Sequence, residues 1–267
     1  MFAVGAVSAD GIDVIGYALG QLMVTAAQVT AHYVNEYADV EADRLVRNRT
    51  FFSGGSGVLA RGELGAVVAL RAAWVGSGVT IAAAAALASE SSAAAAIGVI
   101  ALAIAWSYSL PPMRLVATGW GELVTSLLVA GAVPVVGLLS QGDTPSASLW
   151  WSIAVLVPIH FAMMLAFELP DIDTDSAAGK KVLAVRIGRV QAIRLELALL
   201  AGAMVAAVVA GVIGELPSSV AWWTGAAIVP TVAATKARGP NRHHLRTASA
   251  VATLVLAGIG LLIALNA

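Results

Sequence analysis

Long apolar stretches alternate with shorter polar stretches along the whole chain. A helix needs about 20 mostly apolar residues to cross the hydrocarbon core of a bilayer, and such stretches recur here. They cover about residues 14–34, 62–88, 92–106, 119–140, 149–169, 188–213, 220–236 and 246–265. The pattern predicts an all-α, polytopic transmembrane bundle of about eight spans, in which residues 1–267 form a single domain. Many spans are rich in Ala and Gly, which lets helices approach closely in lipid.

The polar connections fall into two sets. Residues 35–61, 107–118, 170–187 and 237–245 form the long set, and residues 89–91, 141–148 and 214–219 form the short set. Lys and Arg lie on or beside the long set, except for Arg71 inside a span, whereas the short set contains only acids: Glu90, Asp143 and Glu215. Because basic loops stay in the cytoplasm, we expect the long connections on the cytoplasmic side.

Composition agrees with an integral membrane protein. The chain is 59% hydrophobic and 12% charged, about half the charged fraction of an average soluble domain. It contains no cysteine, which excludes disulfides, thiolate metal sites and cysteine nucleophiles. The net charge of −1 indicates no particular partner. The sequence shows no phosphate-binding P-loop and no nucleic-acid pattern, so we expect no nucleic-acid partner.

An acidic stripe follows the first span. Asn35, Asp39 and Asp43 are spaced four residues apart, which places them on one face of a helix. Two carboxylates and an amide on one face suit Mg²⁺, a hard cation that prefers oxygen ligands.

A second acidic cluster repeats this spacing far along the chain. Asp171 and Asp175 are again four residues apart, Glu168 lies one turn earlier, and Lys180 and Lys181 follow. This cluster also ends a span that runs toward the long loops, so we expect both clusters at the same membrane face.

Two carboxylate stripes facing each other would repel strongly unless cations lay between them. Magnesium bound by one or two carboxylates normally completes its shell with substrate phosphates and water. Basic residues nearby, Arg47 among them, would contact the remaining phosphate charge. A diphosphate bridged by Mg²⁺ between two acidic clusters is therefore the economical interpretation. The alternative is that each cluster is a solvated helix end in a loop.

The residues also resemble a known family. NEYADVEAD (35–43) and DIDTDSAAGKKVLAVRIG (171–188) are similar to the two aspartate motifs of the UbiA superfamily of intramembrane prenyltransferases. YSLPPMRL (108–115) resembles the loop between those motifs, and NRTFFSGGSGVL (48–59) and GWGELV (119–124) resemble the dihydroxynaphthoate-prenyltransferase branch. The resemblance covers about residues 30–190, with the motifs in order.

The resemblance implies a helical bundle, usually of nine spans, around a central cavity. It implies Mg²⁺-dependent ionisation of a polyprenyl diphosphate and capture of the allylic cation by an aromatic or lipid-like acceptor. Carried over by position, Asn35, Asp39 and Asp43 would hold one Mg²⁺, and Asp171 and Asp175 the other. Lys180, Lys181 and Arg114 would contact diphosphate, and Tyr108 would face the allylic carbon.

Three points depart from this picture or extend it. We expect the family's first helix to be missing or reduced to Met1–Ala9. Val116 stands where a Lys often follows in the middle motif. His160 shares a stripe with Glu168 that leads into the second acidic cluster, so both are candidate substrate contacts.

Two alternatives remain open at this point. A membrane terpene cyclase on the same scaffold would share both aspartate motifs. A cation transporter is the alternative from another class, but its acids would lie near the bilayer midplane on broken helices. Here the acids lie at helix ends, which favours the enzyme.

Overall fold

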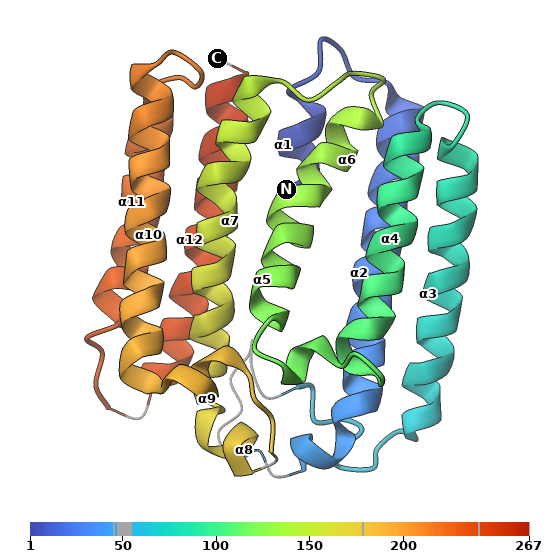
Figure 1. Ribbon diagram of the computed structural model, residues 1–267, viewed down its shortest axis with the longest axis vertical. Coiled ribbons are helices and arrows are strands. Elements are labelled where there is room, and N and C mark those ends of the chain that lie inside the picture. The colour runs from blue at the N-terminus through green and yellow to red at the C-terminus, as the bar shows by residue number, and fades with distance from the viewer. Residues whose placement is uncertain (45, 47–54, 178, 240, 267) are drawn as a thin grey trace.

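The computed structural model describes residues 1–44, 46, 55–177, 179–239 and 241–266, which form helices and connections without a strand (Figure 1). The helices are α1 (Phe2–Ala6), α2 (Val14–Asp43), α3 (Ala66–Leu87), α4 (Ser92–Ser109), the 3₁₀ turn η1 (Leu115–Ala117), α5 (Gly121–Ser126), the π-helical η2 (Leu127–Ala132), α6 (Val133–Leu139), α7 (Ala147–Glu168), α8 (Ile172–Ala177), α9 (Leu183–Ile187), α10 (Arg189–Val212), α11 (Ser219–Ala234) and α12 (Arg242–Leu265).

The predicted membrane bundle is confirmed. Seven described segments are long and apolar enough to cross a membrane: α2, α3, α4, the continuous α5–η2–α6, α7, α10 and α12. The remaining apolar segment is α11, whose 16 residues span only about 24 Å at 1.5 Å per residue. It therefore falls short of the roughly 30 Å hydrocarbon core.

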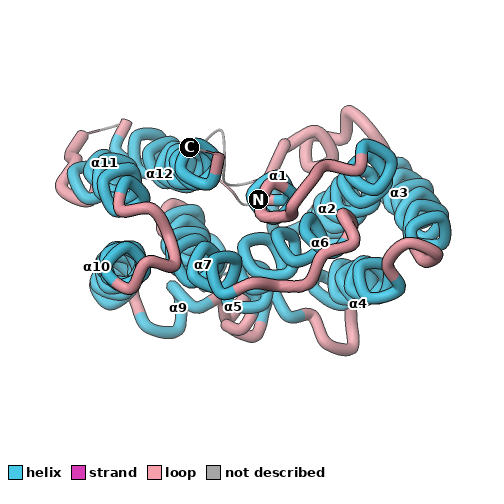
Figure 2. The backbone as a smooth tube through the Cα atoms, turned by 90° about the horizontal axis from the view of Figure 1, so that it is seen from above, coloured by secondary structure: helices cyan, strands magenta, loops and turns pink. Residues whose placement is uncertain are grey.

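The bundle has two groups of helices on either side of a central rod. Helices α2, α3 and α4 pack together in one group, and α7, α10, α11 and α12 pack together in the other. The rod α5–η2–α6 lies between the groups, as the view from above shows (Figure 2). Residues 1–9, where we expected at most a remnant of a helix, contain the five-residue α1, which packs against α6.

Small residues bring the helices close together, as expected for packing in lipid. A Cβ atom at Gly76 of α3 would lie 2.4 Å from Oγ1 of Thr30 on α2, and one at Gly98 of α4 would lie 2.3 Å from the sulfur of Met23. The second group carries a buried ion pair, in which Arg246 of α12 donates to Glu196 of α10.

Alternating helix directions bring all the long connections to one end of the bundle. This is the lower end in Figure 1, where α8, α9 and the end of α2 lie. Helix α2 runs on past the apolar segment to Asp43, so the first acidic motif is helical as its spacing requires. Helix α7 instead ends at Glu168, and a turn over residues 169–171 precedes α8. The second acidic motif is thus not one continuous stripe.

Candidate active site

The two acidic motifs meet at one lysine. The Nζ atom of Lys180 donates a hydrogen bond to Oδ2 of Asp39 at 2.9 Å and lies 3.7 Å from Oδ1 of Asp175. These three side chains are between 7 and 16% exposed. Asp39 and Lys180, which are 141 positions apart in the chain, therefore meet at one end of the bundle.

Burial and charge together set the ionisation of this cluster. Burial raises the pKa of the Asp175 carboxyl above its usual value, although the Lys180 ammonium opposes the shift. Burial alone would lower the pKa of Lys180, but the Asp39 and Asp175 carboxylates more than offset it, so its pKa is raised. Lys180 is therefore a fixed positive charge between the two motifs.

Within the described residues, one oxygen of this cluster has no partner. Oδ1 of Asp39 is buried and accepts no hydrogen bond from any described atom. One turn earlier, Oδ1 of Asn35 accepts a hydrogen bond from Oγ of Ser109 at 3.0 Å, which joins α2 to α4. A buried carboxylate oxygen without a donor is costly unless a cation or ligand satisfies it.

The donor set fits magnesium better than a metal held by protein alone. Among the described residues, no three His, Cys, Asp or Glu side chains lie close enough together to hold a metal. Magnesium is commonly bound by one or two carboxylates, with substrate phosphates and water completing the shell. The oxygens of Asn35, Asp39 and Asp175, with an unsatisfied atom among them, match that pattern.

The glycine-rich segment closes against the first motif. Ser56 donates to Glu36 twice, from its backbone N at 2.8 Å and from Oγ at 2.9 Å. Gly55 has φ +67°, and a Cβ atom there would lie 2.0 Å from Oδ2 of Asp43. Both the backbone conformation and the contact with Asp43 therefore require glycine at this position.

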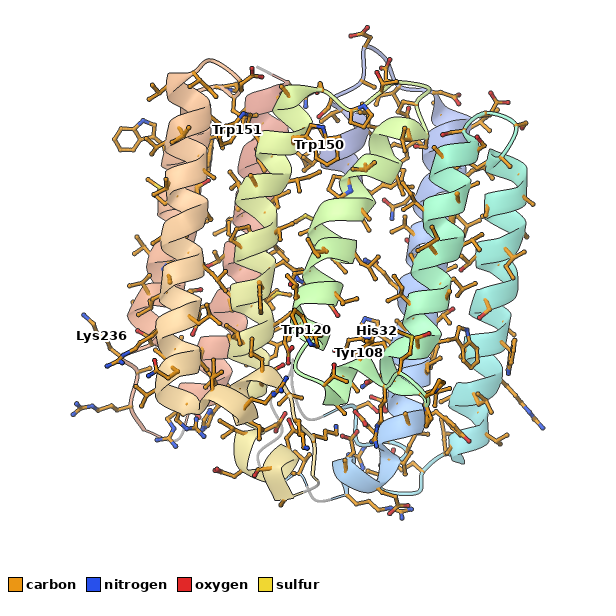
Figure 3. All side chains as sticks on the ribbon, in the orientation of Figure 1. His32, Tyr108, Trp120, Trp150, Trp151 and Lys236 are labelled. Carbon is orange, nitrogen blue, oxygen red and sulfur yellow. The ribbon has the colours of Figure 1, made fainter. Side chains whose placement is uncertain are left out.

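Polar groups continue from this end into the bundle. The ring of Tyr108 lies against Gly121, since a Cβ atom there would be 3.1 Å from Cε2, and Figure 3 shows Tyr108 in the lower part of the bundle. On α7, Nδ1 of His160 lies 3.0 Å from Oγ of Ser126, and both side chains are buried. Ser126 is the last residue before the π-helical turn η2.

Arg114 lies apart from this cluster. Arg114 has φ +42° and is exposed. It lines a separate groove of about 530 Å³ with Tyr37 and Glu41 of α2 and with Arg44, the residue after that helix. The helical period places Tyr37 and Glu41 on the side of α2 away from the acidic stripe. Lys181 is exposed, Asp171 is half-buried in the turn before α8, and Arg47 falls outside the described residues.

Glu168 has a different neighbour from the one its spacing suggests. Its Oε2 accepts a hydrogen bond from the backbone N of Ala184 at 3.0 Å, and Oε1 of Glu122 accepts one from Leu183 at 2.8 Å. Glu122 was not among the predicted site residues. The sequence could have pointed to Glu122, because it is an acid inside the apolar segment 119–140. Ionisable residues in spans are costly and usually functional.

Solved structures share this fold over nearly the whole chain. A UbiA homologue from Aeropyrum pernix K1 matches with a TM-score of 0.74 and 20% identity, covering 98% of this chain and 94% of that one. A UbiA homologue from Archaeoglobus fulgidus bound to DMAPP and Mg²⁺ matches with a TM-score of 0.70 and 18% identity, and the match covers 95% of this chain and 93% of that one. A digeranylgeranylglyceryl phosphate synthase matches with a TM-score of 0.70 and 12% identity, and the match covers 99% of this chain and 91% of that one.

The fold is thus that of intramembrane helical proteins of the UbiA type. The model of the UbiA prenyltransferase family matches residues 1–255, so the chain belongs to that family and is a prenyltransferase. No curated protein matches the chain by sequence.

Proposed function

We propose that the protein transfers a polyprenyl group from an allylic polyprenyl diphosphate to an aromatic acceptor in the membrane, with Mg²⁺ as cofactor. The observation that carries the proposal is the position of Lys180 between Asp39 and Asp175. A cation between two carboxylates, with an unsatisfied oxygen beside it, suits a diphosphate that arrives with its own metal ions.

The proposed metal ligands are Asn35, Asp39 and Asp43 for one ion and Asp171 and Asp175 for the other. Bound Mg²⁺ would neutralise the charge that develops on the leaving diphosphate. Structures of a UbiA homologue from Archaeoglobus fulgidus contain DMAPP or GPP together with Mg²⁺, which supports a prenyl diphosphate and Mg²⁺ as the molecules that this chain binds.

The residues of the chain would act as follows. Lys180 binds the diphosphate, and Lys181, Arg47 and Arg114 are further candidate contacts. The allylic C–O bond breaks, and its electron pair leaves with the diphosphate. Tyr108 presents an aromatic face to the allylic cation, and the apolar bundle keeps water away. A bond forms from the cation to the acceptor, and the proton that the acceptor loses passes to the released diphosphate.

The acceptor would lie deeper in the bundle than the diphosphate. The buried pair of His160 and Ser126 offers hydrogen-bonding groups there, two turns of α7 above Glu168. An aromatic, quinone-precursor-like acceptor is favoured by the likeness of residues 48–59 and 119–124 to dihydroxynaphthoate prenyltransferases. The basic loops at the same end as the motifs favour the cytoplasmic side for the reaction.

Mass spectrometry of products tests this proposal. The protein in lipid nanodiscs is incubated with Mg²⁺, geranylgeranyl diphosphate and, in separate reactions, a dihydroxynaphthoate, a hydroxybenzoate or a geranylgeranylglyceryl phosphate. A prenylated aromatic product is expected. A product formed only from the glyceryl phosphate would contradict the aromatic acceptor. A cyclised hydrocarbon formed without any acceptor would show that the protein is a cyclase and not a transferase.

A further inference from the structure

Two glutamates from different helices hold the start of α9. Glu122 lies at the start of α5 and is 1% exposed, and Glu168 is the last residue of α7. Their carboxyl groups accept from the adjacent backbone N atoms of Leu183 and Ala184, at 2.8 and 3.0 Å. Both carboxyl groups therefore lie side by side under one short stretch of backbone.

The two carboxyl groups are close neighbours. One oxygen of each group accepts from one of two successive backbone N atoms, which brings the carboxyl groups close together. Oε2 of Glu122 is buried and accepts no hydrogen bond from any described donor. Two ionised carboxylates at this range in apolar surroundings would repel strongly. A single proton between them converts the contact into a hydrogen bond, because a protonated carboxyl is a donor.

The backbone held in this way carries the central lysine. Leu183 is three residues after Lys180, and the backbone N of Lys180 donates to the carbonyl of Asp175 at 2.9 Å. The same connection is fixed from the other side, where Arg186 of α9 donates to the carbonyl of Thr118 at 2.6 Å. The position of Lys180 between the two motifs thus depends on where residues 183 and 184 are held.

We propose that Glu122 and Glu168 form a proton-sharing carboxyl clamp, which positions the 179–184 connection so that Lys180 reaches Asp39 and Asp175 together. The clamp acts through Lys180 and makes both glutamates positioning residues for the prenyl diphosphate. Its role in substrate binding rests on the proposed function above.

Amide hydrogen exchange of residues 183–187 tests the clamp without any catalysis. Glu122→Ala and Glu168→Ala remove a hydrogen-bond acceptor, so exchange in this segment is expected to rise about tenfold, as the loss of one such bond implies. Glu122→Gln and Glu168→Gln keep an acceptor for the amide, and their NH₂ group replaces the shared proton. Exchange in the Gln variants is expected to stay close to that of the wild type.

Kinetics test the link to Lys180. Both Ala variants are expected to raise KM for geranylgeranyl diphosphate about tenfold with a smaller change in kcat, whereas the Gln variants keep both. Glu90→Ala is the control, because Glu90 is exposed at the opposite end of the bundle. If an Ala variant does not assemble, Glu168→Asp shortens the side chain by one methylene and is expected to show the same changes more weakly.

The outcomes separate the two proposals. Unchanged amide exchange in the Ala or Asp variants would overturn the clamp. Gln variants as impaired as the Ala variants would also overturn it, because they would show that the site needs a negative charge and not a hydrogen bond. If exchange responds as expected but the wild type transfers no prenyl group, the clamp stands and the proposed function fails.

Discussion

Lys180 is the residue on which the proposed site depends most. Its ammonium group lies between the carboxylates of Asp39 and Asp175 and compensates their mutual repulsion before any substrate binds. A hydrogen bond to a charged group contributes about 1.5–3 kcal/mol, which corresponds to roughly a ten- to hundredfold change in binding.

Lys180→Met is therefore expected to weaken binding of geranylgeranyl diphosphate by about ten- to a hundredfold, measured as KM or by equilibrium binding. Lys236→Met is the matched control, because Lys236 is exposed and points outward at the same end of the bundle (Figure 3). Equal effects of the two substitutions would show that Lys180 has no special role.

Gly55 offers a second test at the residue scale. A methyl group at this position would meet Oδ2 of Asp43, whereas no described atom lies within 4 Å of the corresponding position at Gly62. Both residues have positive φ, +67° and +73°, so both Ala variants carry a similar backbone cost of about 1–2 kcal/mol.

Activity, compared at matched amounts of folded protein, should fall at least about tenfold in Gly55→Ala, as expected when a charged ligand is displaced. Gly62→Ala should stay near wild type. Similar activity of the two variants would mean that the contact between Gly55 and Asp43 does not matter.

Spacing alone predicted some of this chemistry. The i, i+4, i+8 positions of Asn35, Asp39 and Asp43 require only a continuous helix, and α2 provides it. The place of Lys180 depends on a chain reversal after α8, and that of Glu168 on a helix that ends at this residue. No local periodicity encodes either event, so their partners could not be predicted.

At the scale of the elements, close helix contact holds the first group together. Gly76 of α3 faces Thr30 of α2, with room for a hydrogen atom but not for a methyl group, whereas Gly78 on the same helix meets no described atom within 4 Å. Helix packing in lipid depends on such small residues.

Gly76→Ala should therefore lower the thermal stability of the purified protein. Gly78→Ala should leave it unchanged or raise it slightly, since Ala is the better helix former by about 1 kcal/mol. Thermal unfolding in one detergent measures both. An equal change in the two variants would contradict the contact between α2 and α3.

The hydrophobic pattern predicted every long helix but not the irregular ones. Apolar length alone identifies α3, α7 and α12. A single segment that crosses lipid must pair all of its own backbone polar groups, and a helix does so. The π-helical turn η2 lies inside an apolar stretch that reads as ordinary helix. A π-helical turn adds one residue to a turn of helix. In a stretch where nearly every residue is apolar, the hydrophobic pattern does not reveal that added residue.

At the scale of the whole molecule, the distribution of Lys and Arg predicted which loops share an end. The structure places the basic connections together with both acidic motifs (Figure 1). Membrane orientation is the remaining prediction, and the absence of cysteine makes it easy to test with single introduced thiols.

A membrane-impermeant maleimide added to intact cells is expected to label Ser89→Cys, which is exposed at the end opposite the motifs. Arg238→Cys, exposed at the motif end, should be labelled only in inverted vesicles. The reverse pattern would place the motifs outside the cytoplasm.

A structure of the protein with Mn²⁺ in place of Mg²⁺ and geranylgeranyl thiolodiphosphate, which ionises slowly, tests the central claim most directly. Anomalous scattering locates the metal without ambiguity. We predict Mn²⁺ beside Asp39 and beside Asp175, with the diphosphate between them in contact with Lys180. A diphosphate bound elsewhere, or metal beside only one of the two motifs, would contradict the account.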